Sequence, residues 1–89
     1  MVKRERLDII KDILSIIYQN RNSVKITPLI RQSNMSSTRF KEYYHELLEK
    51  ELVNEIINGG NKFVSLTNKG YRFLEKYNTI VSFIDEFEL

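Results

Sequence analysis

The chain has 89 residues, of which 42% are hydrophobic and 29% are charged, and its formal net charge is +2. This length suits one compact domain with a marginal core, for which oligomerisation would add stability. The sequence has no cysteine, one histidine and no glycine-rich phosphate loop, which argues against disulfide bonds, metal sites, cofactors and enzymatic activity. No apolar run is long enough to cross a bilayer. We therefore expect a non-enzymatic, cytoplasmic protein without a small-molecule ligand.

The charge is distributed unevenly along the chain. Residues 1–41 contain nine Lys or Arg against three Asp or Glu, whereas residues 42–89 contain five against nine. A basic half is typical of a nucleic-acid footprint, although a split along the sequence does not by itself establish a surface patch.

A first helix is predicted from about Glu5 to Asn20. Apolar residues recur there at helical spacing, which indicates one broad buried face; they are Leu7, Ile10, Ile13, Leu14 and Ile17. Lys3, Arg4 and Arg6 lie at its start, where they form either a basic arm that reaches phosphate or a frayed terminus.

A short strand at Val24–Ile26 and a second helix follow. Thr27 before Pro28 predicts a helix that is capped by the threonine and begins at the proline, which lacks only a backbone donor that would be unsatisfied there. This helix should expose Arg31 and end near Asn34, since asparagine tolerates the left-handed conformation of a tight turn.

A third helix, at about residues 36–50, follows after that short turn. Ser36 is a suitable N-cap, and Met35 before it can pack against Phe40. The apolar positions share one side of the helix, which should face a core; they are Phe40, Tyr43, Tyr44, Leu47 and Leu48.

The other side of this third helix is polar and basic. It carries Ser37, Thr38, Lys41 and His45, with Arg39 near its edge. Two helices joined by a short turn, the second with such a face, form a helix-turn-helix whose second helix can enter a DNA major groove. A merely solvated face would show the same pattern.

A hairpin, or wing, is predicted at about residues 52–66. The aliphatic runs at 52–57 and 62–66 are separated by Asn58-Gly59-Gly60-Asn61, residues that accept the positive φ angles of a tight turn. Asn61 and Lys62 at the tip could approach DNA phosphates or a minor groove, or the hairpin could simply cover the core.

Thr67 should cap a last helix that runs from Asn68 to about Phe87. Its apolar residues recur at spacings of four and three, which is typical of a coiled-coil seam; the predicted dimerisation residues are Phe73, Tyr77, Ile80, Val81, Ile84 and Phe87. At ~1.5 Å per residue this helix would be about 30 Å long, enough to leave the domain and pair with a second copy. In the alternative, it folds back across the first helix and the protein is a monomer.

The order of these elements, with LLEKELV before the wing and SLTNKGYRFLEKY after it, resembles the small archaeal winged-helix DNA-binding proteins over nearly the whole chain. The resemblance implies an α+β, mainly helical winged helix-turn-helix at 1–67 and a dimerisation helix at 68–89, which in that group pairs as an antiparallel coiled coil. It implies a DNA-binding homodimer associated with the nucleoid. An acidic tail at 85–88 departs from the pattern of the group.

The predicted DNA contacts divide into two kinds. Phosphates would be bound by Arg31, Arg39, Lys41 and Lys62, and base edges by Ser37, Thr38, Arg39 and His45, while Ser36 chiefly caps its helix. Three function classes fit these residues: a DNA-binding transcriptional regulator, an architectural chromatin-type protein with little sequence preference, and a winged-helix module that binds another protein.

Overall fold

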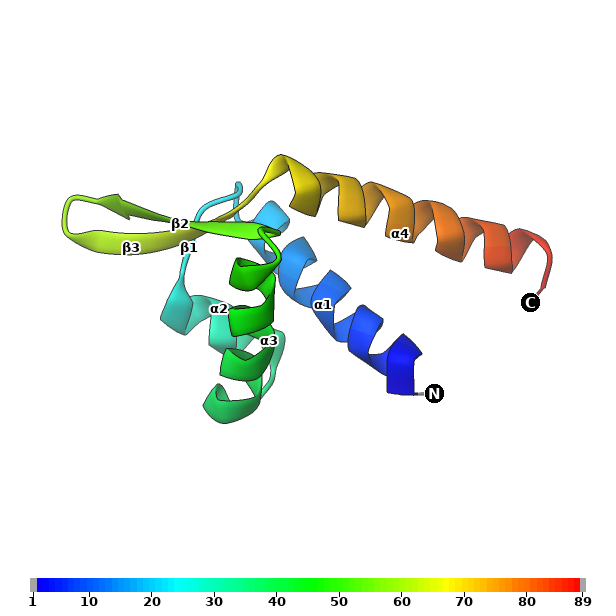
Figure 1. Ribbon diagram of the computed structural model, residues 1–89, viewed down its shortest axis with the longest axis horizontal. Coiled ribbons are helices and arrows are strands. Elements are labelled where there is room, and N and C mark those ends of the chain that lie inside the picture. The colour runs from blue at the N-terminus through cyan, green and yellow to red at the C-terminus, as the bar shows by residue number, and fades with distance from the viewer. Residues whose placement is uncertain (1, 89) are drawn as a thin grey trace.

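The computed structural model describes residues 2–88 and has four helices and a three-stranded antiparallel sheet among them. The elements are α1 (Val2–Gln19), β1 (Val24–Lys25), α2 (Ile26–Ser33), α3 (Ser37–Glu49), β2 (Val53–Asn58), β3 (Asn61–Leu66) and α4 (Asn68–Glu86). Three helices and the sheet form a body, from which the β2–β3 hairpin extends at one end and α4 at the other (Figure 1). The predicted class, α+β and mainly helical with a hairpin wing, is confirmed.

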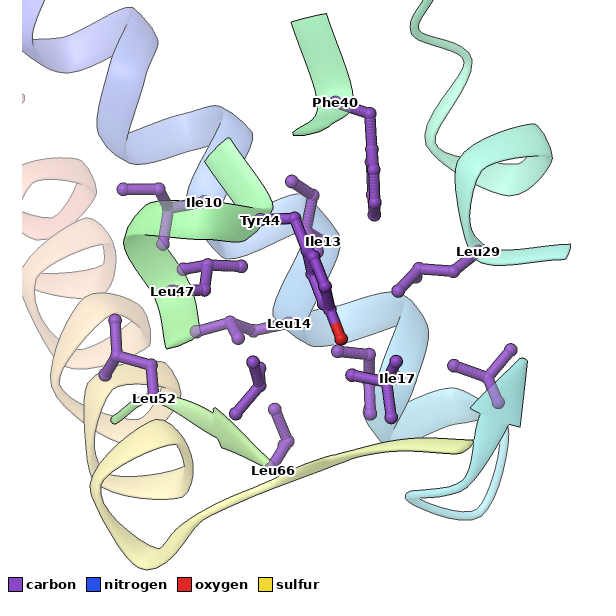
Figure 2. Close-up of a cluster of buried hydrophobic side chains, with 13 residues drawn as sticks. Ile10, Ile13, Leu14, Ile17, Leu29, Phe40, Tyr44, Leu47, Leu52 and Leu66 are labelled. Atoms are coloured by element: carbon purple, nitrogen blue, oxygen red, sulfur yellow. The ribbon is translucent and has the colours of Figure 1, made fainter. Parts of the chain in front are cut away.

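The core forms around α1, because its apolar stripe faces α2, α3 and the root of the sheet. Figure 2 shows the side chains of this cluster converging from those elements. The fully buried residues include Ile13, Leu14 and Ile17 of α1, Leu29 of α2, Phe40 and Leu47 of α3 and Val64 of β3. Leu7, predicted to face inward, is 40% exposed, since the buried cluster begins only at Ile10.

The caps of α3 and α4 are those predicted. The Ser36 hydroxyl accepts a hydrogen bond from the backbone N–H of Arg39, and the Thr67 hydroxyl accepts one from the backbone N–H of Gly70. Asn34 after α2 has a φ of 59° and a ψ of 34°, the predicted left-handed conformation.

The predicted start of α2 is wrong by two residues. The helix begins at Ile26, with Lys25 as an N-cap that makes no side-chain hydrogen bond, so Thr27 is not the cap. The cause is a long-range pairing: Lys25 is held against Phe63 in the sheet, and the chain turns into the helix directly after it. Pro28 still lies in the first turn, where no backbone N–H has a partner within the helix.

The hairpin has the predicted two-glycine turn. Strand β3 lies between β1 and β2, and the β2–β3 ladder runs from Val53 opposite Leu66 to Asn58 opposite Asn61. Gly59 and Gly60 connect the strands with φ angles of 59° and 83°. Because both angles are positive, the turn belongs to the kind whose twist matches that of the strands.

Helix α4 packs on α1 along its first half only, and its second half leaves the body. Its first half packs on α1, where the rings of Tyr18 and Tyr71 meet edge to face with centroids 5.8 Å apart and the Lys11 ammonium lies 5.8 Å from the ring centroid of Tyr77. Every residue from Asn78 to Glu88 is exposed, and this half projects away from the body (Figure 1). No helix within residues 2–88 is long and apolar enough to span a membrane.

Gly70 is required where α4 starts against the wing root. A Cβ at this position would lie 2.3 Å from the carbonyl oxygen of Leu52, a backbone atom that cannot move aside easily. Gly70→Ala should therefore lower the free energy of unfolding by about 2 kcal/mol or more, measured by urea denaturation. An unobstructed helical glycine would instead gain about 1 kcal/mol from alanine, so a stabilised variant would refute this contact. Asn68→Ala, an exposed change in the same turn, is the control.

Candidate nucleic-acid interface

Packing of the apolar side of α3 in the core determines which of its side chains are exposed. Burial of Phe40, Tyr44 and Leu47 fixes the rotation of the helix about its axis, and the Ser36 cap fixes where it begins. The opposite face then points to solvent; its residues, Ser37, Thr38, Arg39, Lys41 and His45, are all exposed. Arg31, in the last turn of α2, is exposed as well.

His45 and Lys62 each lie beside a carboxylate. The Nε2 atom of His45 is 3.7 Å from a carboxylate oxygen of Glu49, one helical turn away, and the His45 side chain is 79% exposed. The ammonium of Lys62 is 3.6 Å from the Oε1 atom of Glu55 across the hairpin. Any phosphate or base that binds these two side chains must therefore compete with an acidic neighbour.

The wing tip is open on all sides. Asn58, Gly59, Gly60, Asn61 and Lys62 are exposed, and a Cβ added at either glycine would have no atom within 4 Å. A surface can thus approach the backbone of this turn closely, as minor-groove or phosphate contact requires.

Of the three basic residues at the start of the chain, Arg6 has a partner within the protein. Arg6 pairs with Glu46 of α3, so its guanidinium holds α1 against α3. The side chains of Lys3 and Arg4 lie outside those that the structure describes.

The sequence prediction missed Tyr44 and Glu55 as a polar connection between α3 and the wing. The Tyr44 hydroxyl donates a hydrogen bond of 2.5 Å to the Oε2 atom of Glu55. Helical periodicity assigned Tyr44 to the core, where its ring indeed packs, stacked on Phe40 with centroids 5.7 Å apart. The position of its hydroxyl depends on how α3 packs against β2, which periodicity does not give.

The two-helix unit with an exposed second helix, followed by a hairpin, defines a winged-helix protein. Residues 3–84 match the family described as winged helix-turn-helix, and the chain belongs to that family. A comparison with curated protein sequences gives no match.

Three solved structures have the same fold. Sso10a-2, a DNA-binding protein from Sulfolobus solfataricus, has a TM-score of 0.69 and 19% identity, over 92% of this chain and 83% of its own. F93 from STIV, a winged-helix DNA-binding protein, has a TM-score of 0.70 and 16% identity, over 91% and 89%. The oxidised form of MarR from E. coli has a TM-score of 0.65 and 17% identity, over 92% and 69%.

These comparisons confirm the resemblance to small archaeal winged-helix proteins at the level of the fold. Membership of the winged helix-turn-helix family also supports the prediction that the chain is not an enzyme. The individual DNA contacts and the dimerisation residues stay predictions.

The Tyr44–Glu55 contact predicts a pH dependence of stability. Burial raises the pKa of the Tyr44 hydroxyl far above its ordinary value near 10, and the hydrogen bond to Glu55 and the charge of Glu55 raise that pKa further. Above pH 10 the unfolded chain therefore releases this proton while the folded protein keeps it, so stability falls as pH rises. Urea denaturation between pH 8 and pH 11 should show a steeper loss for the wild type than for Tyr44→Phe. Tyr43→Phe is the matched control, and parallel curves for the wild type and Tyr44→Phe would contradict the assignment.

Proposed function

We propose that this protein is a DNA-binding transcriptional regulator that inserts α3 into the major groove and rests the wing on the backbone or in the minor groove. The observation that carries the proposal is the exposed row of Ser37, Thr38 and Lys41 on a helix whose opposite face is locked into the core. Hydroxyl and basic side chains on one rigid face are the groups that read base edges and hold phosphates.

Arg31, Arg39, Lys41 and Lys62 supply the phosphate contacts in this proposal. Base readout falls to Ser37, Thr38, Arg39 and His45, and the arginine is suited to a two-bonded contact with guanine. Asn61 approaches the backbone from the wing, while Ser36 contributes by fixing the start of α3. Sso10a-2 and F93, which have similar folds, are DNA-binding proteins, and this supports the assignment.

The proposed regulator acts as a homodimer through α4, with residues 68–89 as the dimerisation segment. The projecting half of α4 exposes Ile80 by 57%, Val81 by 40%, Ile84 by 37% and Phe87 by 57%. Phe73 and Tyr77 continue the seam toward the body and are half-buried. Such a row of exposed apolar side chains is rare on a monomer and is expected at an interface between chains.

The charges along α4 favour an antiparallel pair. Lys69, Arg72 and Lys76 lie in its first half, and Asp85, Glu86 and Glu88 lie at or just after its end. An antiparallel arrangement brings each acidic end near the basic half of the partner, whereas a parallel one places like charges together. A two-fold dimer would bind pseudo-palindromic sites with half-sites about 34 Å apart or a multiple of that distance.

Phe83 extends the predicted seam. It is 54% exposed, and its ring centroid lies 4.8 Å from that of Phe87. Phe83 lies three positions after Ile80 and four before Phe87, but the alternating series of spacings that defined the seam passes through Ile84 instead, so the pattern did not select it. We add it to the proposed interface.

DNA binding is tested by fluorescence anisotropy of a labelled random-sequence duplex. Because the two protomers of the proposed dimer together bring six or more Lys and Arg side chains to DNA phosphates and release counterions, affinity should fall by roughly 10³-fold or more between 50 and 200 mM salt. Unlabelled genomic fragments then serve as competitors. A fragment that competes about 10³-fold better than random DNA supports a regulator, and equal competition by all fragments supports an architectural protein. Absence of binding at low salt would reject the proposal in favour of a protein-binding module.

Dimerisation is tested by placing charges on the seam. The double variant Ile80→Glu with Ile84→Glu should be monomeric by multi-angle light scattering, because four carboxylates would be buried in the paired helices. Asn78→Glu with Ser82→Glu adds the same charge on exposed polar positions of α4 and should leave the dimer intact. A monomeric wild type, or an unchanged dimer mass in the seam variant, would contradict the proposed interface.

A further inference from the structure

A chain of three side chains connects the buried face of α3 to the wing. Tyr44 donates its 2.5 Å hydrogen bond to Oε2 of Glu55, and the other carboxylate oxygen of Glu55 lies 3.6 Å from the ammonium of Lys62. Tyr44 is only 9% exposed, so its hydroxyl is held by a ring that is packed in the core. Both oxygens of Glu55 are thus occupied by neighbours of known position.

Glu55 belongs to the last residue pair of the hairpin that still contacts the core of the body. Glu55 pairs with Val64, which is fully buried. Residues 56–62 are all exposed, and Phe63, which follows them, is half-buried. The next rung on the same face joins Ile57 to Lys62. Glu55 and Lys62 are therefore diagonal neighbours on one face, within reach of long side chains.

Lys62 is the only Lys or Arg in the wing strands and their turn, at 53–66. Its predicted partner is a DNA phosphate, yet its partner within the protein is a carboxylate that the core holds in place. The Lys62 side chain is 52% exposed and that of Glu55 is 30% exposed, so the ion pair faces solvent and is weak enough for phosphate to replace it.

We propose that Glu55, positioned by Tyr44, restrains the wing electrostatically: it engages Lys62 in the free protein and repels DNA phosphates near the wing, which lowers non-specific DNA affinity. This inference rests on the proposed DNA-binding function. A phosphate that binds Lys62 must either displace Glu55 from the ammonium or approach its negative charge, and the carboxylate is held in place by the tyrosine. The wing therefore contributes little to binding unless the remaining contacts of α3 bring a phosphate close to Lys62.

Glu55→Gln removes the charge while leaving an amide oxygen that can still accept the hydrogen bond from Tyr44. This variant should bind a labelled random duplex about three- to tenfold more tightly than the wild type at low salt. The slope of log affinity against log salt should steepen by about one for each protomer bound, since one further lysine in each chain now releases a counterion.

Glu75→Gln is the matched control, because it makes the same change of net charge at an exposed position of α4. This helix extends from the body on the side opposite to the wing (Figure 1). Its effect on affinity should stay below about twofold, with an unchanged salt slope. Thermal unfolding of each variant shows whether the fold is retained.

A double-mutant cycle with Lys62→Ala separates the pair from a general charge effect. Lys62→Ala should weaken duplex binding only slightly in the wild-type background and by about tenfold in the Glu55→Gln background. Equal losses in both backgrounds would overturn the inference and leave the proposed function intact. The same holds if Glu55→Gln binds duplex DNA like Glu75→Gln, or more weakly than the wild type. If neither the wild type nor any variant binds duplex DNA, both are overturned.

Discussion

The backbone around Leu52 is the constraint on which the arrangement of the molecule depends. The Leu52 N–H donates to the carbonyl of Leu47 at the end of α3, and its own carbonyl accepts from the N–H of Thr67 between β3 and α4. The Thr67 hydroxyl also donates to the carbonyl of Glu51, and Gly70 leaves room for the Leu52 carbonyl at the start of α4. Helix α3, the wing root and helix α4 therefore meet at backbone groups, which admit few alternative arrangements. In the proposed dimer this junction would fix the distance between the two wings, because α4 starts from it rigidly.

Local chemistry explains why so much of this fold could be predicted from the sequence. The caps at Ser36 and Thr67 and the turn at Gly59-Gly60 each depend on a few adjacent residues, and the burial of Phe40 and Leu47 follows from helical spacing alone. The start of α2 could not be predicted in this way. Lys25 is fixed by pairing with Phe63, which is 38 positions away in the chain, and that pairing overrides the local preference of Thr27 for a cap.

For the candidate site, the sequence predicts which side chains of α3 are exposed but not which groups they contact. A helical pattern identifies which side of α3 is polar, but the partners of those polar groups come from packing between elements. The neighbourhood of Lys62 and Glu55 follows from the hairpin register, which the position of the two-glycine turn already implied. The hydrogen bond from Tyr44 could not be predicted, because it depends on how α3 packs against β2. The exposure of Phe83 could not be predicted either, because it depends on α4 leaving the body after Tyr77.

The positions of the acidic side chains bear on whether the proposed DNA binding would be selective for sequence or general. A protein that coats DNA without sequence preference takes its affinity from phosphate neutralisation, and each carboxylate near its binding surface weakens it. Here His45 lies beside Glu49 and Lys62 beside Glu55, and the net charge of the chain is only +2. If phosphate contacts contribute little to the affinity for DNA, the proposed binding depends more on base contacts from α3. In the proposed DNA complex, this balance would favour a selective protein over a general DNA coat, because a larger share of the affinity would come from base contacts.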